Sequence, residues 1–204
     1  VKFVRAWAEA RGWQVGYLSF SDQIKEEARS RGIPEAVFTR ELLSDVVTQM
    51  RAAEGPAVLA RRIVARIRGL AQQQCPELFV VEAVRHVDEI ALLRESFGSR
   101  FVVLGVTADP DVIADRLLAR RRPDESREAM QGRENARAMI LRELRGEAAA
   151  RGVNVGACLE QADALIENRR RRLPPDAARA AAMPGDGLVR LIRRVFYGRQ
   201  HAVG

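Results

Sequence analysis

Short apolar segments alternate with helical patterns along this chain. Four segments predict strands: Trp13–Phe20, Leu78–Val81, Phe101–Val106 and Ala164–Ile166. The middle two contain continuous apolar runs, which are typical of strands buried on both faces of a parallel sheet. Helices are predicted over Asp22–Arg31, Glu35–Ala53, Pro56–Leu70, Val87–Ser96, Pro110–Arg120, Arg133–Ala150 and Gly187–Tyr197. This alternation predicts an α/β fold, a three-layer sandwich with a parallel sheet between helices and right-handed crossovers.

The first residues also have a helical pattern. Val1, Val4 and Ala8 are spaced to form one apolar face, and Gly12 ends the helix. In a fold of this type, a helix with a buried face normally follows a strand. The 204 residues contain no strand ahead of this helix, so we expect the first, central strand of the sheet to be missing from the chain.

The composition fits one domain over residues 1–204. Of these residues, 47% are apolar and 30% are charged, which is enough apolar material for a sizeable core. The biased segment Arg169–Gly187 is predicted to be an irregular arginine- and proline-containing loop. No apolar run approaches the ~18 residues of a membrane helix, so no membrane partner is expected. Cys75 and Cys158 alone cannot form a disulfide framework, which favours the reducing cytoplasm.

The charge favours an anionic partner. The net charge is +7, and only Lys2 and Lys25 of the 34 basic residues are lysines. Arginine binds phosphate in a bidentate manner, although drift toward arginine codons accounts for the bulk of the excess. Nucleic-acid binding through Arg169–Arg172 is a weaker hypothesis, because the run lacks interleaved aromatic residues and a recognised motif. The oligomeric state is left open.

Polar residues follow each predicted strand. In open parallel sheets, ligands bind at the carboxyl ends of the strands. Carboxylates there can hold the waters of Mg²⁺ and a guanidinium can bind phosphate, so the set predicts a magnesium–phosphate site, although each residue alone is equally compatible with a structural cap. The set consists of Ser19, Ser21, Asp22, Glu82, Arg85, His86, Thr107, Asp109, Glu167 and Asn168.

An arginine cluster lies at the end of the helix after the third strand. Arg116 and Arg120 are four residues apart and share one helix face, and Arg121 and Arg122 follow before Pro123. This arrangement suits a lid, over about residues 116–130, that closes on phosphates and excludes water. The alternative is a solvated basic helix face.

Five segments together resemble the P-loop nucleoside and nucleotide kinase family. They are YLSFSDQIK (17–25), the helix pair from Arg40 and Arg51 to GPAVLARR (40–62), FVVEAVRHVDEIALLR (79–94), VTADPDVIADRLLARRR (106–122) and GVNVGACLEQADALIEN (152–168). Their order and spacing are most similar to dephospho-coenzyme A kinases and the deoxynucleoside monophosphate kinase-like proteins, many of which are described as AAA-family ATPases. The resemblance implies transfer of a phosphoryl group from ATP, with Mg²⁺, to a nucleotide-like acceptor.

The resemblance also implies roles on the acceptor side. Asp22 matches the acid near the acceptor's phosphate or attacking hydroxyl, and Arg85 matches the arginine that binds acceptor phosphate. Arg40 and Arg51 belong to the acceptor-binding helical region, residues 35–70. Glu82 stands where aspartate is more usual, and the next residue is alanine where the family has glycine. Asp22 and Glu82 would contact the metal through water.

On the donor side, the resemblance implies a lid and an asparagine beside the nucleotide. Arg116, Arg120 and Arg122 match arginines that contact the donor's phosphates, with Arg116 and Arg120 also catalytic. Asn168 matches the asparagine that closes the last strand near the nucleotide. Ile113 stands where many relatives carry a further arginine.

One departure concerns the defining motif of that family. The pattern G-x-x-x-x-G-K-[ST] does not occur in the 204 residues. Without this motif, no loop binds the β- and γ-phosphates, no lysine contacts them, and no hydroxyl binds the metal. We therefore expect an N-terminally truncated kinase, inactive by itself, that lacks on the order of 10–20 residues of strand and loop. The alternative is a degenerate, non-catalytic nucleotide-binding or regulatory module.

Overall fold

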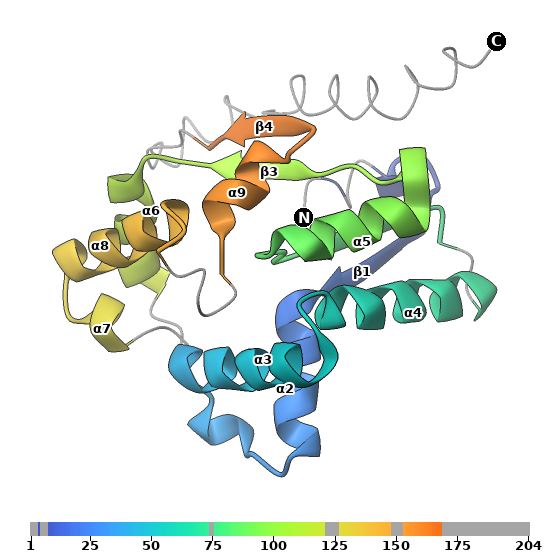
Figure 1. Ribbon diagram of the computed structural model, residues 1–204. Helices are drawn as coiled ribbons and strands as arrows, with labels where there is room; N and C mark the ends of the chain where they lie inside the picture. Colours follow the sequence, from blue (N-terminus) through green and yellow to red (C-terminus); the bar gives the residue numbers. More distant parts are fainter. Residues whose placement is uncertain (1–3, 5–7, 74–75, 121–126, 148–152, 169–204) are drawn as a thin grey trace.

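The computed structural model describes residue 4 and residues 8–73, 76–120, 127–147 and 153–168. The described part is an α/β structure that is mostly helical, with small parallel sheets (Figure 1). In chain order its elements are β1 (Val15–Ser19), α2 (Phe20–Ser30), η1 (Glu35–Val37), α3 (Arg40–Glu54), α4 (Val58–Gln73), β2 (Leu78–Glu82), α5 (Val87–Phe97), η2 (Gly98–Arg100), β3 (Leu104–Thr107), α6 (Pro110–Arg120), α7 (Arg127–Met130), α8 (Arg133–Leu144), α9 (Val155–Glu160) and β4 (Ala164–Glu167).

The strands pair in parallel, as predicted, but in two separate pairs. β1 pairs with β2, so that Ser19 lies opposite Glu82. β3 pairs with β4, so that Thr107 lies opposite Glu167. The prediction of one continuous sheet is therefore not met among the described residues, which form two two-stranded sheets. Within each pair, the predicted strand-end residues do meet at one edge.

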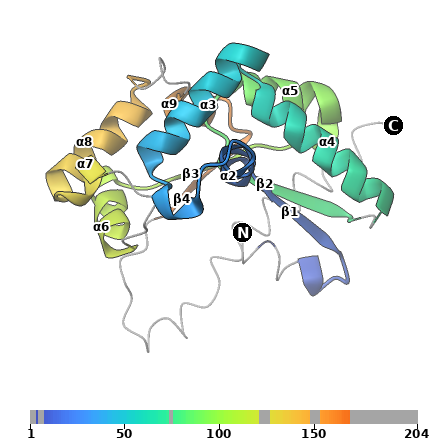
Figure 2. The same ribbon diagram turned by 90° about the horizontal axis from the view of Figure 1, so that it is seen from below.

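The β1–β2 pair is covered on both faces. Leu18 and Phe79, on one face, belong to the main core with α4 and α5, which lie side by side in Figure 2. Val15 and Val80, on the other face, pack in a cluster with Ala8 and its neighbours Val4, Trp13 and Leu78. Both faces of β2 thus pack against apolar side chains, as predicted for this strand, whereas Tyr17 of β1 is 43% exposed.

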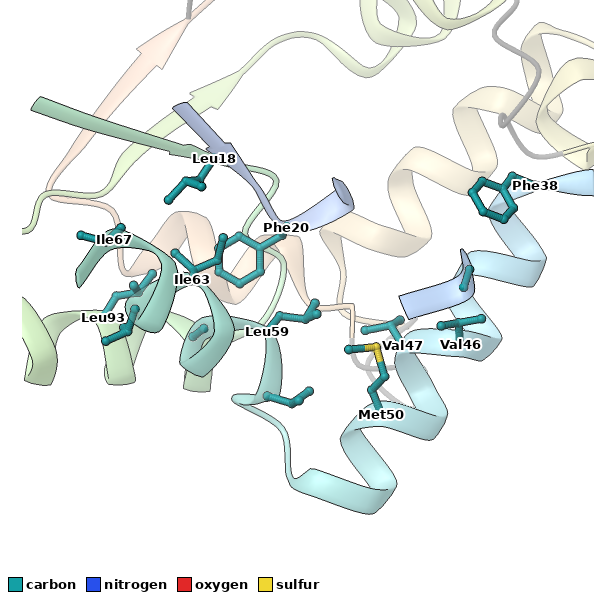
Figure 3. Packing of buried hydrophobic residues seen from close by; sticks show 14 residues of the cluster. Leu18, Phe20, Phe38, Val46, Val47, Met50, Leu59, Ile63, Ile67 and Leu93 are labelled. Atoms are coloured by element: carbon teal, nitrogen blue, oxygen red, sulfur yellow. The ribbon is translucent and has the colours of Figure 1, made fainter. Parts of the chain in front are cut away.

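Phe20 lies near the centre of the main core. It is the first residue of α2 and is fully buried, and Figure 3 shows its ring beside Ile63 and Leu59 of α4. Met50 and its neighbours on α3 extend the cluster away from the sheet. α2, α3 and α4 are therefore held together by one apolar cluster under the carboxyl end of β1.

A second, smaller cluster joins α6, α7 and α8. It contains Leu117 of α6 with Met139 and Ile140 of α8. Outside the cluster, the Arg133 Nε lies 2.6 Å from an Asp115 carboxylate oxygen, so an ion pair also connects α6 with α8. These helices form the unit that carries the predicted lid arginines.

Three predicted elements differ from the structure. The helix expected over Glu35–Ala53 is split, because the Thr39 hydroxyl accepts the Leu42 N–H and starts α3 anew. β3 begins at Leu104 instead of Phe101, and Val106 is 59% exposed, so burial on both faces is wrong for this strand. The helix expected to reach Ala150 ends at Leu144, and Gly146 then takes a left-handed φ of 74°.

Several predictions lie outside the described residues. They concern Trp7, Cys75, Arg121 and Arg122, the loop after Pro123, the irregular segment Arg169–Gly187 and the helix Gly187–Tyr197. Among the described helices, none combines the length and the apolar character needed to cross a bilayer.

Truncating the core at Ile63 should destabilise the whole fold. Ile63 is fully buried between the sheet and α5, so Ile63→Ala should lower the free energy of unfolding by about 2–5 kcal/mol. Val37, which is 50% exposed, provides the control, and Val37→Ala should change it by less than about 0.5 kcal/mol. Urea denaturation followed by circular dichroism measures both. Equal losses for the two variants would contradict this description of the core.

Candidate functional site

Two predicted acceptor-site arginines meet at one carboxylate. Arg40, the first residue of α3, makes a salt bridge with Oε1 of Glu143 near the end of α8. Nη1 of Arg85, in the turn after β2, lies 3.5 Å from Oε2 of the same carboxylate. The side chains of Arg40, Arg85 and Glu143 are 25%, 41% and 20% exposed, so solvent still reaches the group. Residues 40 and 85 are thus brought together by an acid that the sequence did not suggest.

A close helix contact fixes the end of α8 beside this group. A Cβ at Gly156 of α9 would lie only 2.0 Å from the carbonyl oxygen of Leu144, so glycine is required where α9 crosses α8. Asn154 begins α9, and its side chain accepts the Ala157 N–H. Glu143 is therefore next to a rigid contact between two helices.

The turn that carries Arg85 is held from several directions. Ala83 has a left-handed φ of 68°, at the position where the kinase resemblance has glycine. The Arg85 N–H donates to Oε2 of Glu89 at 3.3 Å, and the Arg85 carbonyl accepts the Asn154 N–H at 2.9 Å. His86 caps α5, with Nδ1 accepting the Asp88 N–H, which confirms it as a turn residue. Both backbone polar groups of Arg85 are therefore used to fix the turn.

A buried ion pair lies beneath this turn. Nη2 of Arg51 on α3 is 2.7 Å from Oε1 of Glu89, and the two side chains are 11% and 1% exposed. Burial raises the pKa of Glu89, and the hydrogen bond from Arg51 opposes that rise. Arg51, predicted to bind the acceptor, is thus placed against Glu89, while its contact with an acceptor stays a prediction.

Cys158 lies close to the same pair. Its thiol is buried on α9, and burial, together with the charge of Glu89, raises its pKa to about 11. The thiol is therefore protonated at neutral pH, and it serves as a core residue, as the sequence suggested.

The two predicted metal-site acids lie around Tyr17. On the β1–β2 pair, Tyr17 is diagonal to Glu82, and its hydroxyl donates a hydrogen bond to that carboxylate. Partial burial, then Glu82, then Asp22 in the first turn of α2 raise the pKa of Tyr17 far above its usual range. Asp22 and Glu82 are both exposed, and two carboxylates with water and phosphate suffice for Mg²⁺. The described residues contain no group of three or more metal-binding side chains.

Two of the residues predicted for the donor side, Arg116 and Asn168, lie at the end of the β3–β4 pair. The Asn168 N–H donates to the Thr107 carbonyl at 2.7 Å and continues the ladder. Nη2 of Arg116 on α6 lies 3.3 Å from the Asn168 carbonyl oxygen and 3.4 Å from Oδ1. Arg120 is exposed at the last residue of α6, and Arg122 is outside the described residues. Arg116 and Asn168 are therefore adjacent, while their contact with a nucleotide stays a prediction.

Three site residues were missed from the sequence. Glu89 had a local signal, because an acid three residues after a helix cap often bonds back to the preceding backbone. Tyr17 had a weaker signal, since it lies two residues before the strand-end residue Ser19, and the two side chains therefore point to the same face of the strand. Glu143 had none, because its partner Arg40 is 103 residues away.

Comparisons with known proteins find archaeal relatives, and no family model matches the chain. A UPF0200/UPF0201 protein of Archaeoglobus fulgidus is 29% identical over 116 residues, which is 57% of this chain and 34% of that protein. The UPF0200 protein PH1008 of Pyrococcus horikoshii is 33% identical over 109 residues, 53% of this chain and 56% of the relative. The UPF0200 protein Mbar_A0975 of Methanosarcina barkeri is 27% identical over 151 residues, 74% and 72% of the two chains.

The chain is therefore similar to UPF0200 proteins, whose names state no activity or substrate. It spans about a third of the Archaeoglobus relative and just over half of the Pyrococcus relative. Any activity of the whole protein must accordingly be proposed from the site itself.

Removing one partner of the buried pair should unfold much of this site. Arg51→Met leaves the Glu89 carboxylate buried without its cation, and the free energy of unfolding should fall by about 3–5 kcal/mol. Arg62→Met is the matched control, because the Arg62 side chain is 32% exposed in its ion pairs with Glu27 and Glu54, and the change should cost less than about 1 kcal/mol. Thermal and urea denaturation measure both. A loss at Arg51 no larger than at Arg62 would show that the pair does not hold the site.

Proposed function

We propose that these residues form the acceptor and lid regions of a small-molecule kinase. The enzyme would transfer the γ-phosphoryl group of ATP to a nucleotide-like acceptor of the nucleoside monophosphate, deoxynucleoside monophosphate or dephospho-coenzyme A type. The observation that carries the proposal is the convergence of Arg40 and Arg85 on one carboxylate. Two guanidinium groups that share an anion in this way are suited to bind a phosphate group.

On the acceptor side, Arg40 and Arg85 would bind the phosphate of the acceptor. Asp22, exposed in the first turn of α2, would orient the attacking hydroxyl or its phosphate. Arg51 would act through Glu89 by holding the Arg85 turn. In phosphoryl transfer, positioning and charge neutralisation supply most of the catalysis, so a fixed turn is a functional requirement.

On the donor side, Arg116 and Arg120 would contact the phosphates of ATP, with Asn168 beside the nucleotide. The contact between Arg116 and Asn168 supports a shared site. Asp22 and Glu82 would hold Mg²⁺ through its waters, and both carboxylates act on Tyr17, which supports their closeness. When bound, the ion neutralises charge on the transferred group.

The arrangement of the four strands in one sheet is part of the same proposal. The two parallel pairs, β1–β2 and β3–β4, would be the two halves of one sheet on either side of a central strand, as in P-loop kinases. The coverage of β1–β2 on both faces supports the three-layer sandwich.

The 204 residues do not contain the G-x-x-x-x-G-K-[ST] loop that would bind the β- and γ-phosphates of ATP. The proposed activity therefore belongs to a protein in which such a loop is joined to this chain. The second candidate is a non-catalytic nucleotide-binding or regulatory module.

ADP release separates the two candidates. A form of the protein that carries a phosphate-binding loop ahead of residue 1 should release ADP from ATP and Mg²⁺ when given a deoxynucleoside monophosphate or dephospho-coenzyme A. Arg85→Ala should lower kcat/KM by about 10²-fold, because a charge-assisted contact with the acceptor is lost. Arg66→Ala, on the exposed side of α4, should leave it unchanged.

Two outcomes would contradict the proposal. Binding of ATP and acceptor, seen by calorimetry, without ADP release would favour the non-catalytic module. Turnover that is unaffected by Arg85→Ala would place the acceptor site elsewhere.

A further inference from the structure

We propose that Glu143 is an internal competitor that makes the Arg40–Arg85 site selective for dianionic phosphate groups. The inference rests on the acceptor side of the proposed function and adds a residue that sets its specificity. Each carboxylate oxygen of Glu143 contacts a different arginine, so one side chain bridges both guanidinium groups. A phosphate monoester has three terminal oxygens and can make the same two contacts.

Charge decides which anion replaces the carboxylate. At equal distances, a dianion attracts two guanidinium groups about twice as strongly as a carboxylate does. A monoanion that displaces Glu143 carries the same charge as the carboxylate, so it gains no electrostatic attraction. It still loses translational and rotational freedom on binding. Glu143 therefore sets a threshold that a phosphate monoester passes and a carboxylate ligand does not.

The surroundings of Glu143 allow this exchange without unfolding. The side chain is 20% exposed and Arg85 is 41% exposed, so an anion can approach from solvent. The contact between Gly156 and Leu144 fixes the adjacent backbone. The backbone of Arg85 is fixed because its N–H donates to Glu89 and its carbonyl accepts the Asn154 N–H. Rotation about the side-chain torsions of Glu143 is then sufficient to vacate the space between the arginines.

Direct binding of small anions tests the proposal on the 204-residue protein. Isothermal titration calorimetry is run at pH 8 and low salt, with inorganic phosphate and with acetate as probes. Glu143→Gln keeps the size of the side chain and removes its charge, and it should bind phosphate about tenfold more tightly, because the site is no longer occupied by a competitor. It should also bind acetate measurably, which a purely structural role of Glu143 would not produce.

Control variants separate the local effect from a change in net charge. Glu134→Gln makes the same charge change on the exposed first turn of α8 and should leave phosphate affinity within about twofold. Adding Arg40→Ala or Arg85→Ala to Glu143→Gln should abolish the gain. Should Glu143→Gln not fold, Glu143→Asp, which is too short to contact both arginines, is measured with the same expected gain.

Unchanged or weaker phosphate binding by the folded Glu143 variant would overturn the proposal and leave Glu143 as a structural link between α8 and α3. The outcome is independent of ATP. If the Glu143 variant binds phosphate more tightly but the protein transfers no phosphoryl group, the proposed kinase activity is wrong and the competitor role of Glu143 stands. If the protein transfers a phosphoryl group but the variant binds phosphate no more tightly, the kinase activity stands and the competitor role is wrong.

Discussion

The carboxylate of Glu89 is the group on which the candidate site depends. A buried charge is tolerated only when a partner and further hydrogen bonds replace the lost water. Glu89 meets this requirement with the Arg51 guanidinium at one oxygen and the Arg85 N–H at the other. The helix α3, the turn after β2 and the start of α5 therefore cannot separate without leaving that charge unsatisfied, and the backbone of Arg85 is held by this constraint.

A second acid, Glu143, connects the helices α6, α7 and α8 to the candidate site. The main core holds α2, α3, α4 and α5 against β1 and β2, whereas α6, α7 and α8 form their own apolar cluster. Glu143 is on the second unit and its two arginines are on the first. An electrostatic and partly exposed link therefore joins α8 to α3 and to the Arg85 turn, which suits a junction that changes when an anion binds.

Periodic patterns made much of the local structure predictable. Apolar runs located all four strands, and the pattern after the third gave α6 over Pro110–Arg120 as observed. The break before α3 was missed, because the hydroxyl of Thr39 starts a new helix within a pattern that reads as continuous. The exposure of Val106 was missed for a different reason: an apolar run shows what a strand can bury and not what covers it.

The site was less predictable than the fold. Strand ends gave Asp22, Glu82 and Arg85 at the β1–β2 pair and Asn168 at the β3–β4 pair, because parallel strands gather such residues at their carboxyl ends. Local sequence does not show whether an arginine faces solvent or a buried acid, and Arg51 pairs with Glu89 inside the protein. The partner of Arg40 comes from a helix 103 residues further along, through packing that no local pattern encodes.

The most direct test of this account is a crystal structure of the protein with a bound deoxynucleoside monophosphate. The account predicts the phosphate between the guanidinium groups of Arg40 and Arg85, with the Glu143 side chain turned away and the Arg51–Glu89 pair intact. A structure in which Glu143 still contacts both arginines, while the phosphate of the ligand lies elsewhere, would contradict it.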